Sequence, residues 1–146
     1  MTLVDQVAER LVLKVPSLAG RIGKAGDLAA LMDAGSLPQG NQAAFIVPLG
    51  FRAGEVTAAT GLHSQSLARR VAIILVIRFA GNPTGAKTIP EVDQLERETL
   101  RAIAGWKPNG AWDAFAVERG ALLGLKPGVA FFEIDFTISE LLRIHA

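Results

Sequence analysis

The two histidines are the first residues to test for chemistry, because imidazole can act as a general base or a metal ligand near neutral pH. His63 lies in a polar stretch and His145 is next to last. Neither occurs in an H-x-x-H or H-E-x-x-H pattern, and Ser64 and Ser66 are neighbours of His63 without a G-x-S-x-G context. We therefore expect His63 in an exposed loop and His145 in an exposed tail, and no catalytic residues.

Glu133 and Asp135 form the one acidic pair with a spacing that suits chemistry. Two residues apart on a strand, their carboxylates stand roughly 6.6 Å apart on one face, a separation that suits a metal ion or acid–base work. Nothing else in the sequence converges on them. We expect solvation or pairing with an arginine of a neighbouring strand, Arg70 or Arg78, and no metal site.

Phosphate-binding loops and cysteine chemistry are not encoded. The glycines of residues 20–26 match neither G-x-x-x-x-G-K-[ST] nor G-x-G-x-x-G, so we interpret them as flexible backbone before a helix. The chain has no cysteine, which excludes disulfides, thiolate metal sites and cysteine nucleophiles. We expect no cofactor.

Composition favours one soluble domain that spans residues 1–146. Fifteen basic and fourteen acidic residues nearly cancel, so no cluster predicts a grip on nucleic acid. The N-terminus lacks the pattern of a signal peptide, and the longest near-apolar run, residues 71–77, is too short to cross a bilayer. Half of the residues are apolar, which suggests that partners cover some apolar surface.

In the first half of the chain, hydrophobic spacing predicts two helices and a strand. Residues 2–15 form a helix that Thr2 and Asp5 cap and Pro16 ends. Residues 27–34 form a short helix with Asp27 as N-cap and Gly35 just beyond its end, after a short strand at Arg21-Ile22. A strand covers 42–47 and stops at Pro48. Residues 49–66 are then either a long loop or a protruding hairpin.

The second half supplies the strongest strand signals. Residues 67–79 are apolar on both faces and predict a central strand. A turn-forming loop (80–86), a helix over 88–104 with Thr88 and Glu91 as capping box, and a loop at 105–112 follow. Strands at 117–125 and at 130–138 or beyond flank a turn at 126–128, which makes them an antiparallel hairpin. The expected fold class is α+β: a single, mainly antiparallel sheet with helices packed against it.

Six residues are candidates for contacts with other proteins. Trp106 and Trp112 share one Gly- and Pro-containing loop, and tryptophan is enriched both in cores and at interface hot spots. The same two interpretations apply to Phe51 and Arg52 in the 49–66 segment. Arg69 and Arg70, on opposite faces of the central strand, complete the set.

A set of sequence features is similar to the tail terminator (tail completion) proteins of long-tailed and Mu-like phages, including those of bacterial prophages. The resemblance extends from about residue 4 to residue 142. The residues that carry it are L37-P38, A43-A44-F45-I46-V47-P48, the Gly61 loop, the strand at 66–81, the segment G105-W106-x-P108-x-G110, and the closing strand at 131–138.

The resemblance implies a non-enzymatic virion protein that assembles with itself, as a ring and most simply a hexamer. Such a ring would cap the head-proximal end of the tail tube and stop tail polymerisation. It would contact the tail-tube protein and a head-completion or neck protein, and would let DNA pass without specific binding. The implied location is the virion tail, after synthesis in the host bacterial cytoplasm, with no role for a membrane.

Two other functions stay open at this point. The chain could be another structural component of the same particle, such as a neck or head-completion protein. A small ligand-binding or hydrolytic domain is the second alternative, and it would require His63, Glu133, Asp135, Arg70 and Arg78 to meet in one pocket.

Overall fold

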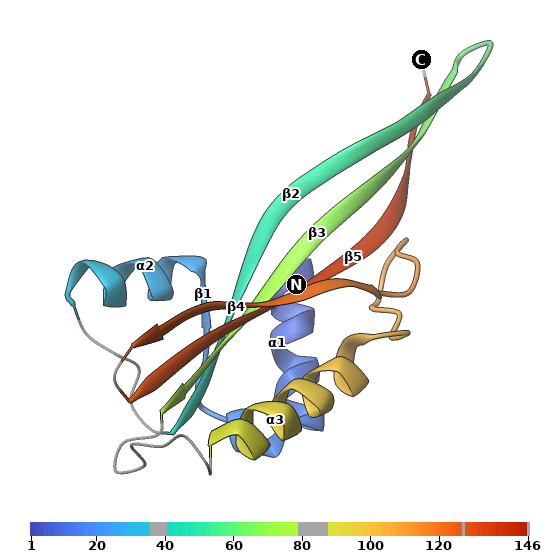
Figure 1. The fold of residues 1–146 in the computed structure, drawn as a ribbon. Coiled ribbons are helices and arrows are strands. Elements are labelled where there is room, and N and C mark those ends of the chain that lie inside the picture. Colours follow the sequence, from blue (N-terminus) through green and yellow to red (C-terminus); the bar gives the residue numbers. More distant parts are fainter. Residues whose placement is uncertain (36–40, 79–87, 127, 146) are drawn as a thin grey trace.

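The computed structural model describes residues 1–35, 41–78, 88–126 and 128–145, with the side chains of residues 58, 88, 89 and 126 left out. Its centre is a five-stranded sheet in the order β1-β2-β3-β5-β4 (Figure 1). The strands are β1 (Ile22–Lys24), β2 (Gln42–Ala59), β3 (Leu62–Arg78), β4 (Ala116–Lys126) and β5 (Val129–His145). Only the β1–β2 pairing is parallel. The predicted α+β class with a mainly antiparallel sheet is therefore confirmed.

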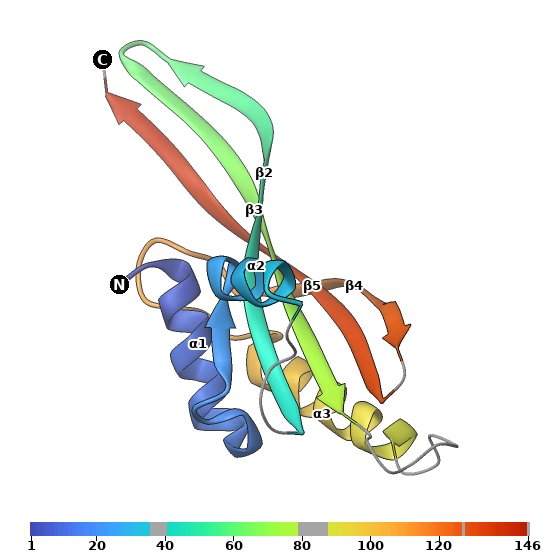
Figure 2. The same ribbon diagram turned by 90° about the vertical axis from the view of Figure 1, so that its left-hand side faces the viewer.

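Strands β2, β3 and β5 continue well beyond the helices as a three-stranded ribbon, which we call the arm (residues 49–69 and 138–145; Figures 1 and 2). The prediction that Pro48 ends a strand is wrong. β2 runs through Pro48 with a register shift before Gly50 and a second one between Ala53 and Val56. The hairpin interpretation of residues 49–66 is the correct one, with Gly61 in its turn at φ +76°.

The inner part of β3 is buried on both faces, as a central strand requires. Val71, Ile73, Leu75 and Ile77 face one hydrophobic cluster, which α1 (Leu3–Lys14) and α3 (Thr88–Ile103) cover. The alternate residues Ala72, Ile74 and Val76 face the side on which α2 (Ala25–Asp33) lies (Figure 2). β3 begins five residues earlier than predicted, because its polar outer half belongs to the arm.

The N-terminal helix follows its sequence signals. Thr2 Oγ1 accepts from the Asp5 backbone N–H at 3.1 Å, and Asp5 accepts in turn from the Thr2 backbone at 3.0 Å. Val7 and Leu11 are fully buried against the sheet. The helix ends at Lys14, just before Pro16 opens the 3₁₀ turn η1 (Pro16–Leu18).

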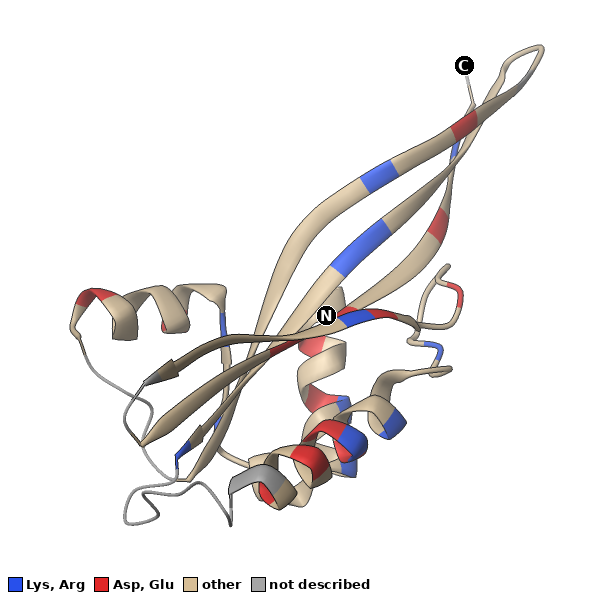
Figure 3. Ribbon diagram, in the orientation of Figure 1, with Lys and Arg blue, Asp and Glu red and all other residues tan. Residues whose placement is uncertain are grey.

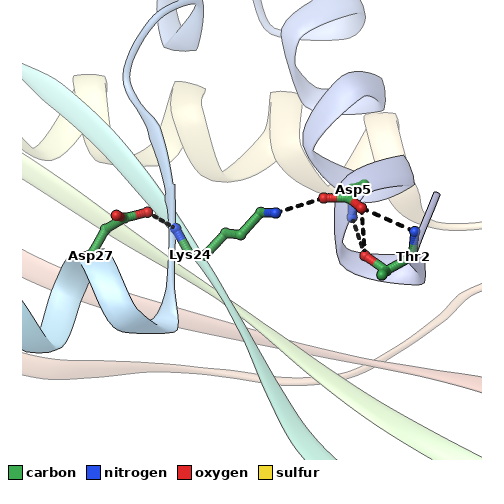
Figure 4. Close-up of polar contacts among 4 residues, drawn as sticks. All are labelled: Thr2, Asp5, Lys24 and Asp27. Carbon is green, nitrogen blue, oxygen red and sulfur yellow. Dashed lines mark hydrogen bonds and ion pairs between the residues drawn. The ribbon is translucent and has the colours of Figure 1, made fainter.

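Helix α2 begins two residues earlier than predicted, so Asp27 is not its N-cap. Asp27 lies in the first turn and accepts from the Lys24 backbone N–H at 2.7 Å, while the Lys24 side chain reaches Asp5 at 2.7 Å (Figure 4). Asp27 still accepts a hydrogen bond from a free backbone amide at the start of the helix. The sequence therefore indicated a helix start correctly but placed it two residues too late. Gly35 follows the helix with φ +65°, as expected.

The remaining connections are partly outside the described residues. Several predicted features fall outside the described residues: the loop at 80–86, the Thr88 side chain of the proposed capping box, Pro127 of the 126–128 turn, and L37-P38. The antiparallel β4–β5 hairpin itself is confirmed, and β5 continues beyond residue 138 to His145. The loop that follows α3 is tied to α1, since Gln6 exchanges two hydrogen bonds with the Asn109 backbone at 2.7 and 3.0 Å.

Candidate functional site: the arm and its base

Three of the six predicted contact residues meet at the base of the arm. The guanidinium carbon of Arg69 lies 5.3 Å from the Phe51 ring centroid and 5.9 Å from that of Trp112. Phe51 and Arg69 are cross-strand neighbours, and both side chains point to the helix side of the sheet. The Phe51 side of this group remains open, since Phe51 is 58% exposed.

Glu140 of β5 completes the group. Arg69 Nε donates to Glu140 Oε1 at 2.9 Å, and the Trp112 backbone forms a β-bridge with Glu140. Each cation–π contact contributes about 0.5–1 kcal/mol at such a partly solvated site. The contacts hold the Arg69 side chain in place, so the arm base presents an aromatic surface with its charge already neutralised.

The other three predicted contact residues lie elsewhere. Trp106 stacks on Phe115 with ring centroids 5.8 Å apart and packs against the main core, with Arg10 5.3 Å from its ring. Its geometry favours the core interpretation over the interface one. Arg52 is exposed on the opposite face of the arm, and Arg70 belongs to a charged cluster on the α2 side of the sheet.

That charged cluster contains the acidic pair. Asp135 is 1% exposed, and its Oδ2 lies 3.4 Å from Arg70 Nη2 and 3.3 Å from Arg119 Nε. Arg119 also approaches Glu133 at 3.7 Å, and Arg70 pairs with Glu118 at 2.9 Å. The expected arginine partnership is thus confirmed for Arg70. Arg78 takes no part in it, and Arg119 was missed because β4 was not aligned with β5 from sequence.

The charges of the cluster offset one another in part. Burial raises the pKa of Glu133, and the nearby Asp135 charge raises it further, while the arginines oppose both effects. The hydrogen bond to Glu118 raises the pKa of Arg70. Asp135 Oδ1 is buried with no hydrogen-bond partner among the described residues. The group therefore holds three carboxylates against two guanidinium groups, and its geometry is that of an ion-pair network.

The histidines do not join this cluster. His63 lies in β3 within the arm and contacts Gln65, with Nε2 3.1 Å from Oε1, so the loop prediction for it is wrong. Its β5 partner is Ile144, whereas Asp135 pairs with Ala72, nine residues further along β3, a separation of roughly 30 Å. His145 is exposed at the end of β5. In the described part of the chain no three His, Asp or Glu side chains are placed to hold a metal ion.

The two faces of the arm differ in chemistry. Strand alternation places the helix-side residues of the arm in register with the main core, and these residues are mostly apolar. Phe51, Val56 and Ile144 are 52–58% exposed there, beyond the cover of the helices. The other face is mainly polar: Arg52, Thr57, Ser64, Ser66, Ser139 and Arg143.

Sequence reasoning could not decide between the loop and the hairpin interpretations of residues 49–66, for a physical reason. Each register shift in β2 moves the following side chains to the other face, so the apolar residues do not alternate along residues 48–56. The available signal was Gly61, a turn-forming residue between the two segments that pair as β2 and β3.

The fold and these surfaces define an α+β protein with an exposed apolar face on its arm. The model of the family "Phage tail terminator protein" matches residues 2–146, so the chain belongs to that family. No curated protein matches it. The family gives the protein a structural role in a phage tail and makes it a virion component. None of the described helices is both long and apolar enough to cross a membrane.

Proposed function

We propose that this protein forms a closed ring on the head-proximal end of a phage tail tube, where it ends tail polymerisation and provides the surface that joins the head. Family membership supports a role in the phage tail, and the arm supports the formation of a ring. The observation that carries the proposal is the arm: a ribbon whose apolar face lies beyond the helices, with Phe51, Val56 and Ile144 each more than half exposed.

An exposed apolar face of this kind costs solubility unless a partner covers it. Its base is rigid, because Arg69 joins Phe51, Trp112 and Glu140. A rigid surface loses little conformational entropy on binding, which suits a permanent structural contact. A hexamer, the tail-tube protein and a head-completion or neck protein are the proposed partners, and DNA passes through the ring without being bound specifically.

The test is electron microscopy of particles from a host that lacks this gene. The proposal expects overlong tails without heads, and restoration of normal length when the gene is supplied. Tails of normal length with detached heads would instead favour a neck or head-completion protein. Heads and tails that are normal and joined would contradict both structural roles.

A further inference from the structure

We infer that Glu133 and Asp135 hold one proton between them, which the Glu133 carboxyl group donates to Oδ1 of Asp135. The shared proton makes the ion-pair network of β3, β4 and β5 sensitive to pH. The network lies outside the arm, so the inference does not rest on the proposed ring. It gives a role to the buried acidic pair, which the proposed function leaves unused.

Asp135 uses one of its oxygens for the arginines and leaves the other without a partner. Its Oδ2 lies 3.4 Å from Arg70 Nη2 and 3.3 Å from Arg119 Nε. Its Oδ1 is buried and has no hydrogen-bond partner among the described residues. A buried acceptor without a partner is unfavourable, so a donor is needed at Oδ1.

Glu133 is the group placed to supply this donor. It lies two residues before Asp135 on β5, opposite Ile74 of β3, whereas Asp135 lies opposite Ala72. Residues two apart share a strand face, so both carboxyl groups are on the α2 side of the sheet. The Arg119 guanidinium reaches both of them, with Nη2 3.7 Å from Glu133 Oε2. The Glu133 side chain is only 16% exposed, so water competes weakly for its carboxyl group.

The charge balance of the network also favours one bound proton. Charged residues of β3, β4 and β5 lie near one another in the middle of the sheet (Figure 3). Three carboxylates, those of Glu118, Glu133 and Asp135, face the guanidinium groups of Arg70 and Arg119. One proton brings the sum of these charges to zero. The excess negative charge is least favourable at Glu133 and Asp135, because they are the most buried members.

The pKa of Glu133 is shifted in the direction that a shared proton requires. Burial raises this pKa most, and the charge of Asp135 and a hydrogen bond to Asp135 raise it further. Arg119 of β4 and Arg70 of β3 lower it. A carboxyl group whose folded-state pKa is raised contributes stability in acid, and this contribution is lost as pH rises through the folded-state pKa.

The proton therefore acts on the attachment of β4, the edge strand of the sheet. β4 pairs with β5 alone, and Arg119 joins it to both Glu133 and Asp135. With the proton in place, both oxygens of Asp135 have partners. Without it, two neighbouring carboxylates repel each other beside Arg119. We expect β4 to be held more firmly below the raised pKa of Glu133 than above it.

Carbon NMR of the purified protein, labelled at its side-chain carboxyl groups, tests the coupling of the pair. We expect Asp135→Asn to lower the pH midpoint at which Glu133 titrates, because this variant removes a neighbouring negative charge. Glu140→Gln is the matched control, since Glu140 binds Arg69 on the opposite face of the sheet and should leave the Glu133 midpoint unchanged. A Glu133 midpoint that is the same in Asp135→Asn and in the natural protein overturns the inference.

Urea denaturation tests the donation to Oδ1 itself. Glu133→Gln keeps a hydrogen-bond donor at this position, whereas Glu133→Met is similar in size and has none, and both side chains are neutral at every pH. Below the pKa of Glu133, we expect Glu133→Gln to match the natural protein and Glu133→Met to unfold at a lower urea concentration. Equal midpoints for the two variants would show that Oδ1 takes no donor from residue 133, and would overturn the inference while leaving the proposed ring untouched.

Discussion

The same three strands build two different regions, a body that helices cover and an arm that they leave bare. In the body, Ile73 of β3 and Ile134 of β5 are 0% and 1% exposed. In the arm, Ile144 lies on the same sheet face and is 52% exposed. The two regions contain the same type of residue and differ in whether helices cover it. Burial of the apolar face stabilises the body, whereas in the arm the same kind of face remains available for contact.

Replacing core isoleucine gives the largest expected loss of stability. Ile73→Ala should lower the free energy of unfolding by about 2–5 kcal/mol, because it removes buried methyl groups and leaves a cavity. Ile144→Ala should cost less than about 0.5 kcal/mol in the monomer, since the side chain is already half exposed. Urea denaturation of both variants checks the comparison. Equal losses would show that the arm is packed as tightly as the body.

Removing the buried carboxylate comes next. Asp135→Asn should destabilise the protein by about 1 kcal/mol, since it weakens two charged contacts but leaves Arg70 with Glu118 and Arg119 with Glu133. The partial exposure of both arginines keeps the loss small. Urea denaturation at neutral pH measures it. A loss above about 3 kcal/mol would mean that the arginines depend on Asp135 alone.

Neutralising the neighbouring Glu133 should change the free energy of unfolding in the opposite direction. The raised pKa of Glu133 shows that burial and Asp135 disfavour its charge. Glu133→Gln should therefore leave stability unchanged or raise it by a few tenths of a kcal/mol at pH 7, within the usual range for such substitutions. A carboxyl with a raised folded-state pKa gains stability as pH falls through that pKa, so the advantage of the variant should shrink on acidification. An advantage that grows on acidification would contradict this reading.

The smallest expected effect concerns the ion pair between Asp5 of α1 and Lys24 of β1. The hydrogen bond from Lys24, and then those from Thr2, hold the pKa of Asp5 well below its ordinary 3.8. A lowered carboxyl pKa contributes stability that is present above the unfolded-state value and is lost as pH falls below it. Asp5→Asn should therefore melt slightly lower than the natural protein at pH 7, with the gap closing below about pH 4.

Its control is Asp33→Asn, at an exposed carboxylate for which the described residues offer no ion pair. This variant should follow the natural protein at both pH values in calorimetry. If the melting gap of Asp5→Asn persists unchanged at pH 3, the ion pair is not its source.

The body could be predicted from sequence to a much greater extent than the arm. Periodicity located α1, the central strand and the closing hairpin, because each has at least one buried face and its pattern is unbroken. It failed at residues 48–56, where two register shifts in β2 break the alternation. It also placed the start of α2 two residues late, because Asp27 accepts from a backbone amide without being the first residue outside the helix.

Only part of the candidate site could be predicted from the sequence, for a similar reason. Aromatic and arginine residues pointed to Phe51, Arg69 and Trp112, which do meet. The register between strands cannot be derived from local pattern, so it was not possible to predict that Glu140 joins them or that Arg119 reaches Asp135. Long-range pairing of this kind follows from topology and not from local pattern.

One measurement tests the central claim that the bare apolar face of the arm is the assembly surface. A host that lacks the gene is supplied with Ile144→Glu or with Thr57→Glu, two charge insertions on opposite faces of the arm, and tail lengths are measured by electron microscopy. We expect overlong tails with Ile144→Glu and normal tails with Thr57→Glu. Normal tails with a folded Ile144→Glu protein would contradict it.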